Sequence, residues 1–166
     1  MQKILNLYLF LLALLVGLEL AAGVFVAPVI FNPSQFIGDG ILTHFQSGQL
    51  MTQIFVKFNN FLLIISIIAF GYEALNFSKN KKESFNAKFS AFMLALVNLI
   101  LALVFVFYFT DYIVEAQHLQ TTTTQAFSDI HKASEWTMKV MLILQTILFF
   151  LKFPKSKCEA ISKDKR

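Results

Sequence analysis

Four long apolar stretches leave this chain few ways to fold. They cover residues 4–31, 58–77, 89–112 and 137–153. A helix needs about 20 apolar residues to cross the hydrocarbon core of a membrane, and a segment in lipid must be helical to pair its backbone polar groups. The sequence therefore predicts an all-α fold, an integral membrane four-helix bundle. We expect residues 1–153 to form this four-span membrane domain and residues 154–166 to form a basic cytoplasmic tail.

The composition is that of a membrane protein. Hydrophobic residues make up 57% of the 166 positions, charged residues only 14%, and the chain has 20 Phe. These proportions lie outside the range of soluble domains. The net charge of +4 comes from basic residues beside the apolar stretches, so membrane orientation explains it better than nucleic-acid binding. We expect the lipid bilayer as a partner, no nucleic acid, and either a second copy of the chain or another membrane protein.

The distribution of Lys and Arg predicts how the chain is threaded. Eleven of the 14 basic residues are Lys3 or lie in residues 79–88 and 152–166. The positive-inside rule places both termini in the cytoplasm, in a multi-pass protein of the cell membrane, or of the bacterial inner membrane if the source is bacterial. The first stretch stays apolar beyond the small residues at 21–23. We therefore expect a retained span there and not a cleaved signal peptide.

Glu19 is the acidic residue in the middle of the first stretch. An ionisable group near the bilayer midplane costs roughly 3 kcal/mol and is usually paired or functional. Counted along each helix, Ser66, Asn98 and Gln145 fall at a similar depth in the other three stretches. We expect these four residues to meet as an intramembrane polar cluster.

Three interpretations of this cluster follow. The favoured one is a buried hydrogen-bond clamp, in which Asn98 and Gln145 donate to a protonated Glu19 carboxyl. The alternatives are an ion or proton relay through Glu19, and separate contacts between helices.

Small and polar residues predict which helix faces pack. The first stretch carries small residues on two faces, one with Gly17 and one with Gly23, so we expect this helix to be central. On the third stretch an alanine-rich face should pack, and the opposite face, with Leu101 and Phe105, should meet lipid. On the fourth we expect Lys152 to anchor the end of the span at the membrane surface.

The two outward connections have structure of their own. The sequence predicts an interfacial helix over residues 43–58 that leads into the second span. The run Thr121–Thr124 predicts a break, and residues 128–136 are expected to start the fourth helix early, outside the membrane.

No motif of a soluble enzyme is present. The chain lacks a P-loop, a GxGxxG fingerprint, a nucleophile elbow and an HExxH helix, so we expect no catalytic residue, no cofactor and no metal. His44, His118 and His131 are expected on the outer side as surface residues. A haem or copper site that uses these histidines is the alternative, with Met51 or Met138 as a soft ligand.

Three regions together resemble a known family of small four-helix membrane proteins. They are 17–31, 48–55 and 127–134. The family is the domain of unknown function 4149, with transmembrane-protein-205-like relatives in eukaryotes. The resemblance implies an integral membrane protein with no established activity, and Glu19 does not belong to its pattern. The matching positions are Pro28, Phe31, Gly48, Phe55, Phe127, His131 and Ser134.

The functional expectation is a non-enzymatic membrane component with a role in envelope or metal homeostasis. It would act through its outward connections or through a partner. One alternative is a small ion-coupled transporter that uses Glu19, and the other is the haem or copper protein described above.

Overall fold

The protein is an all-α chain with four candidate membrane spans. The computed structural model describes residues 2–80 and 83–164, with side-chain positions for residues 3–80 and 83–153. The described part holds helices and no strand. Four of its segments are long and apolar enough to cross a membrane, namely Lys3–Phe31, His44–Lys79, Phe85–His118 and Gln125–Phe153. The predicted all-α fold is confirmed, and four candidate spans are present where four were predicted, while the orientation of the termini stays a prediction.

Two of the four spans contain a short π-helix. The first span consists of α1 (Gln2–Ala21), η1 (Ala22–Val26) and α2 (Ala27–Phe31). The third consists of α5 (Phe85–Val104), η2 (Phe105–Thr110) and α6 (Asp111–His118). The second and fourth spans lie in single helices, α4 (His44–Lys79) and α7 (Gln125–Asp164), and the short α3 (Ser34–Ile37) lies between the first two spans.

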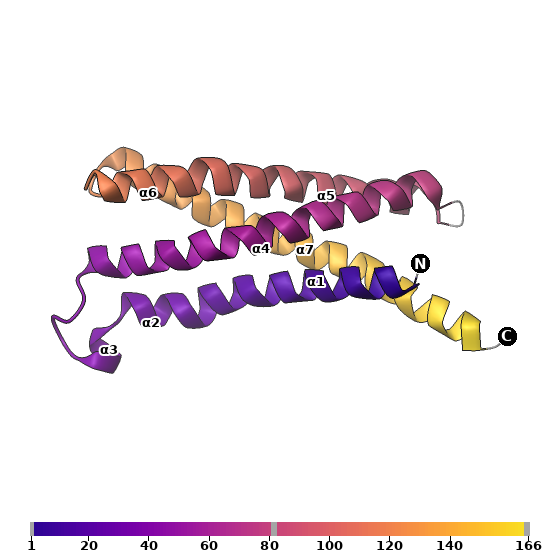
Figure 1. The fold of residues 1–166 in the computed structure, drawn as a ribbon, viewed down its shortest axis with the longest axis horizontal. Helices are drawn as coiled ribbons and strands as arrows, with labels where there is room; N and C mark the ends of the chain where they lie inside the picture. The colour runs from indigo at the N-terminus through magenta and orange to yellow at the C-terminus, as the bar shows by residue number, and fades with distance from the viewer. Residues whose placement is uncertain (1, 81–82, 165–166) are drawn as a thin grey trace.

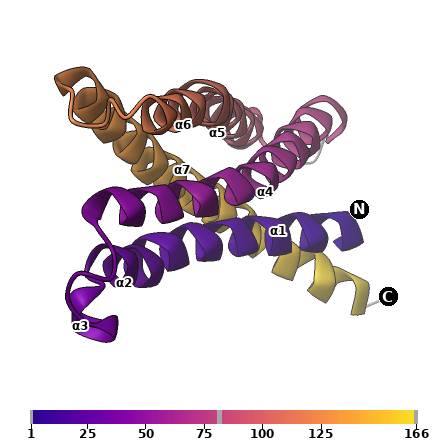
Figure 2. The ribbon, with the colours of Figure 1, turned by 60° about the vertical axis from the view of Figure 1, so that its left-hand side comes forward.

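The two ends of the bundle differ in what they carry. Both termini and the connection between α4 and α5 lie at one end, here called the terminal end (Figure 1). The connections over residues 32–43 and 119–124 lie at the other, the loop end. In Figure 2, α7 crosses behind α4 and α1, so that its beginning lies beside α6 and its far part lies near the N-terminus.

The first span does not occupy a central position, which corrects the expectation from its small residues. α1 and α5 lie on opposite sides, and each packs against both α4 and α7. The face of α1 that packs carries large side chains, among them Leu12 and Leu15, while Gly17 is exposed. Leucines at helical spacing fill the interior better than glycine does, so the leucine face turns inward.

Phe105 is buried, although it was expected to face lipid. Its exposed fraction is 5%, and its ring centroid lies 6.0 Å from that of Phe55. Phe105 follows Asn98 by seven residues and Ala102 by three, so regular helical spacing places it on their buried face. The π-helix η2 begins at Phe105, and because a π turn holds more residues than an α turn, it changes the direction of the side chains after it. Phe109 and Thr110 are both buried.

The second span begins earlier than the sequence predicted. α4 is one continuous helix of 36 residues, where an interfacial helix and a separate span were expected. Thr43 and Gln46 form a capping box at its start. The backbone N–H of Gln46 donates to Thr43 Oγ1, and the backbone N–H of Thr43 donates to Gln46 Oε1. This reciprocal pair satisfies two free amides and fixes the beginning of α4.

The fourth helix begins before the apolar stretch 137–153, as predicted, while the position of its first turns outside the membrane stays a prediction. The threonine run lies between α6 and α7, and α7 starts at Gln125. Thr124 Oγ1 accepts from the Phe127 amide at 3.2 Å. Both the predicted break and the early start of this helix are confirmed.

Candidate functional site

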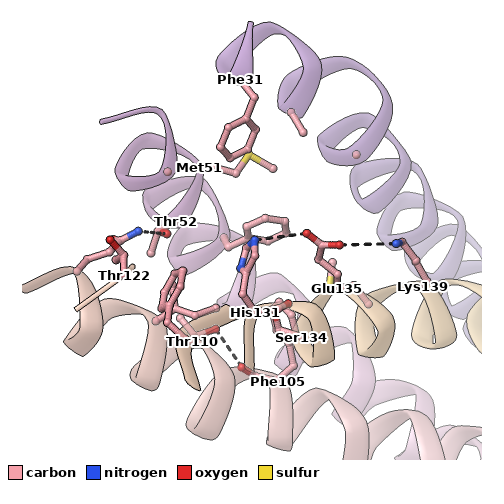
Figure 3. Close-up of a pocket in the computed structure, with 18 of the residues that line it drawn as sticks. Phe31, Met51, Thr52, Phe105, Thr110, Thr122, His131, Ser134, Glu135 and Lys139 are labelled. Atoms are coloured by element: carbon pink, nitrogen blue, oxygen red, sulfur yellow. Dashed lines mark hydrogen bonds and ion pairs between the residues drawn. The ribbon is translucent and has the colours of Figure 1, made fainter. Parts of the chain in front are cut away.

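A cavity of about 710 Å³ lies in the loop-end half of the bundle (Figure 3). All four spans contribute to its wall. Its apolar lining includes Phe31, Met51, Phe55 and Phe105. Its shape is that of a small-molecule site, concave and mostly apolar with a few polar groups.

Small residues keep space open on the side of the first span. Gly23 and Ala27 both line the cavity, and a Cβ atom added at Gly23 would have no neighbouring side chain within 4 Å. Within the first span, α2 packs against α4, whereas the part that packs against α7 is α1, which lies farther from the loop end. The space between η1 and the first turns of α7 is therefore unfilled.

Glu19 lies at the inner end of this cavity. Its exposed fraction is 6%, and its Oε1 accepts from Gln145 Nε2 at 2.9 Å. The same Gln145 nitrogen also donates to Asn98 Oδ1 at 3.3 Å, and Asn98 Nδ2 donates to Ser66 Oγ at 3.2 Å. The structure thus brings together all four residues of the predicted polar cluster, one from each span.

The hydrogen bonds within this cluster differ from the expected clamp in one respect. Asn98 was expected to donate to Glu19, but it donates to Ser66. Gln145 lies between Asn98 and the carboxyl, and its single amide nitrogen contacts both. The cluster is therefore a chain of side chains that starts at Ser66 and ends at Glu19.

One oxygen of Glu19 is free. Oε2 is buried and has no hydrogen-bond partner within the described part of the chain. A buried polar atom without a partner costs about 1–3 kcal/mol. Because Glu19 lines the cavity, a molecule bound there could supply the missing partner.

Ionisable side chains from α7 line the cavity near its opening. His131 Nε2 lies 3.3 Å from Glu135 Oε1, and Lys139 Nζ lies 3.8 Å from Glu135 Oε2 (Figure 3). All three side chains are about half exposed, so these ion pairs add little stability. The His131 ring also stacks on Phe127, with centroids 5.7 Å apart.

The positions that carry the family resemblance gather around this cavity. Ser134 is 5% exposed, and its Oγ donates to the His131 carbonyl at 2.7 Å. Pro28 lies in α2 outside the lining. The other six positions all line the cavity: Phe31, Gly48, Phe55, Phe127, His131 and Ser134.

The three histidines do not form a metal centre within the described residues. His44 and His131 line the cavity and His118 does not. In the part of the chain that the structure describes, no group of three or more His, Cys, Asp or Glu is placed to hold a metal ion. Met51 and Met138, the soft ligands of the haem or copper interpretation, line the cavity with His44 and His131, and that interpretation stays a prediction.

A second buried polar site, which the sequence analysis missed, lies toward the terminal end. Lys152 Nζ lies 2.8 Å from Glu73 Oε2 and 3.6 Å from Glu83 Oε1. The exposed fractions of Lys152 and Glu73 are 2% and 0%, so Lys152 does not anchor the helix at the membrane surface as expected. Its partner Glu73 lies on the inner face of α4, which draws the ammonium into the bundle.

The spacing of polar residues contained a signal for this second site. Glu73 follows Ser66 by seven residues on α4, and Lys152 follows Gln145 by seven on α7. Seven residues are about two helical turns, so each pair lies on one face. The faces of α4 and α7 that contribute Ser66 and Gln145 to the polar cluster therefore also contribute Glu73 and Lys152, two turns nearer the terminal end.

The comparisons with known proteins identify a family and no activity. The model of the family described as "Domain of unknown function (DUF4149)" matches residues 10–122. No curated protein and no solved structure matches the chain. The match contains Glu19 and the first two resembling regions. It ends before residues 127–134, where the resemblance stays a prediction.

Proposed function

We propose that this chain, which belongs to the family of the domain of unknown function DUF4149, binds a small amphiphilic molecule in its loop-end cavity and is not an enzyme. One observation carries the proposal. The cavity ends on a buried carboxyl oxygen, Glu19 Oε2, that has no hydrogen-bond partner in the described part of the chain.

The dimensions and lining of the cavity support an amphiphile as the ligand. Its volume of about 710 Å³ falls within the roughly 300–1,000 Å³ of small-molecule sites. The rings of Phe31, Phe55 and Phe105 offer apolar contacts to the body of such a molecule. Glu19 offers a hydrogen bond to its polar group at the inner end.

The exposure of the lining residues supports entry from the lipid. Leu20 and Val24 on the first span are 45% and 58% exposed, and both line the cavity. On the facing helix the half-exposed and charged Glu135 and Lys139 line it too, so the opening there faces water while the first span faces lipid. With the predicted orientation, the loop end faces outward, and the outer leaflet of the cell membrane would supply the ligand.

Of the functions expected from the sequence, the small carrier that uses Glu19 agrees best with this cavity. A role in envelope or metal homeostasis through a partner stays a prediction, because no geometry in the described residues favours it.

A photoreactive, uncharged long-chain alcohol tests the proposal. The full chain in lipid nanodiscs is labelled with it, and the modified residues are mapped by mass spectrometry. We expect labels on cavity residues such as Met51 and Phe55. Labels confined to lipid-facing residues such as Phe107 would contradict the proposal.

Two glycines of the first span provide matched variants. Gly23 lines the cavity and Gly17 does not, and a Cβ atom added at either would have no neighbouring side chain within 4 Å. Gly23→Phe should therefore fill the cavity and abolish labelling of Met51 and Phe55, while Gly17→Phe should leave it unchanged. An equal effect of both variants would show that the label does not report the cavity.

A further inference from the structure

We propose that the ligand of the loop-end cavity is a cationic amphiphile, and that its binding displaces a proton from Glu19. This inference rests on the proposed function, because it names the class of molecule that the same cavity takes.

The charges around the cavity are unevenly balanced. Near the opening, Glu135 lies within 4.0 Å of both Lys139 and His131. At the inner end, the polar partner of Glu19 is the neutral amide of Gln145. No cation in the described part of the chain forms an ion pair with Glu19. A positively charged ligand would supply the counter-charge that the protein does not.

Burial determines whether the Glu19 carboxyl is protonated in the empty cavity. A carboxylate removed from water and without a cation is strongly disfavoured, so the empty site holds the neutral acid. A cation within a few ångströms favours the charged form instead. Cation binding and proton loss at Glu19 are therefore coupled.

The exchange balances in charge and atoms. The O–H bond of the Glu19 carboxyl breaks, and its proton passes to water at the opening of the cavity. The ligand keeps its charge and forms no covalent bond with the protein. The inner end of the cavity is neutral before the exchange, as an acid, and neutral after it, as a carboxylate and a cation.

The aromatic wall favours the same class of ligand. Phe31, Phe55 and Phe105 line the cavity, and ring faces attract cations, most strongly where water is excluded. An anionic amphiphile would meet these ring faces and the Glu19 carboxyl and would find its counter-charge only near the opening, at Lys139. The combination of rings and one unpaired acid therefore selects for positive charge.

The pH dependence follows from competition between the proton and the cation for Glu19. Affinity should rise with pH, by up to about tenfold per pH unit while Glu19 is protonated in the empty protein. Other titratable groups also line the cavity, His44 from α4 and His131, Glu135 and Lys139 from α7. The segment from η2 to α6 adds only neutral residues to the lining, namely Phe105, Thr110, Ile113 and Gln117. Protonation of a histidine would also weaken cation binding, so each histidine needs its own control.

Tetraphenylphosphonium is a suitable probe, because it is permanently charged and has no proton of its own to release. Its binding to the purified full chain in detergent is measured by titration calorimetry in two buffers of different ionisation enthalpy. We expect about one proton to be released per cation bound. Glu19→Gln should lose the proton release and bind the cation at least about tenfold more weakly. His44→Gln and His131→Gln, at positions that line the cavity, should retain the release of about one proton per cation, and His118→Gln, outside the lining, should retain both properties.

The outcomes separate this inference from the proposed function. If the uncharged alcohol labels the cavity but tetraphenylphosphonium does not bind, the cation inference is wrong and the proposed function stands. If neither binds, both are wrong. Cation binding without proton release, or equal binding by Glu19→Gln, overturns the exchange. If Glu19→Gln does not fold, the wild-type protein still decides, because pH-independent binding between pH 5 and 9 would overturn the inference.

Discussion

At the scale of single residues, the buried ionisable side chains Lys152 and Glu19 differ in whether the protein supplies an opposite charge. Lys152 has two carboxylates within 4.0 Å, so its charge is matched within the protein. Glu19 has a neutral amide at one oxygen and no partner in the described chain at the other. The first arrangement holds helices together, and the second leaves room for a ligand.

Two substitutions of Glu19 separate its hydrogen bond from its charge. Glu19→Gln keeps a side chain that can accept from Gln145, so the free energy of unfolding should stay close to that of the wild type. Glu19→Leu leaves Gln145 with one partner fewer and should lower the free energy of unfolding by roughly 1 kcal/mol. Reversible unfolding in mixed micelles measures both. A Glu19→Gln variant that is less stable than Glu19→Leu would contradict the hydrogen-bond account.

The sequence predicted which polar residues of the four spans meet, but not how each is used. Glu19, Ser66, Asn98 and Gln145 could be matched because depth along a helix follows directly from residue number. The direction of each hydrogen bond could not, since it depends on which amide lies between the others. The free oxygen of Glu19 and the cavity beside it appear only when the helices are placed in space.

At the scale of elements, the predictions were wrong where the packing face of a helix was assigned to the wrong residues. Phe105 was placed in lipid, although it follows Asn98 by seven residues and Ala102 by three and so continues their buried face. The ion pair between Glu73 on α4 and Lys152 on α7 was missed because Lys152 was considered only as a surface anchor. Small residues on α1 suggested a central helix, but packing depended on its leucines.

The ion pair between α4 and α7 should contribute strongly to stability. Lys152→Met leaves Glu73 and Glu83 without their buried cation and should lower the free energy of unfolding by about 3–5 kcal/mol. The double variant Lys152→Met with Glu73→Leu removes two of the charges and should recover much of that loss. Unfolding in mixed micelles measures each variant.

Lys139 provides the control for this comparison. It pairs with Glu135 at 3.8 Å, and its side chain is 60% exposed, so Lys139→Met should change the free energy of unfolding by less than about 1 kcal/mol. An equal loss in the Lys139 and Lys152 variants would contradict the buried ion pair.

At the scale of the whole molecule, the bundle places its features at different depths. The ion pair of Lys152 lies toward the terminal end, the polar cluster lies mid-span, and the cavity lies toward the loop end. Both termini share one end (Figure 1), as an even number of spans requires. The positive-inside rule then predicts that the cavity opens outward.

Reporter fusions test this orientation. A reporter inserted after residue 81 or fused after residue 166 should read as cytoplasmic, and one after residue 40 or 122 should read as external. The expected pattern follows from the excess of Lys and Arg at the terminal end. An external signal after residue 166 would reject the predicted orientation.

The central claim is that the loop-end cavity holds a ligand against Glu19, and ligand protection of an introduced thiol tests it most directly. In a Cys158→Ser background, Gly23→Cys and Gly17→Cys are each modified with a maleimide, with and without saturating tetraphenylphosphonium. Gly23 lines the cavity and Gly17 does not. We predict that the cation slows modification severalfold at position 23 and leaves the rate at position 17 unchanged. Equal rates with and without the cation at position 23 would contradict the claim.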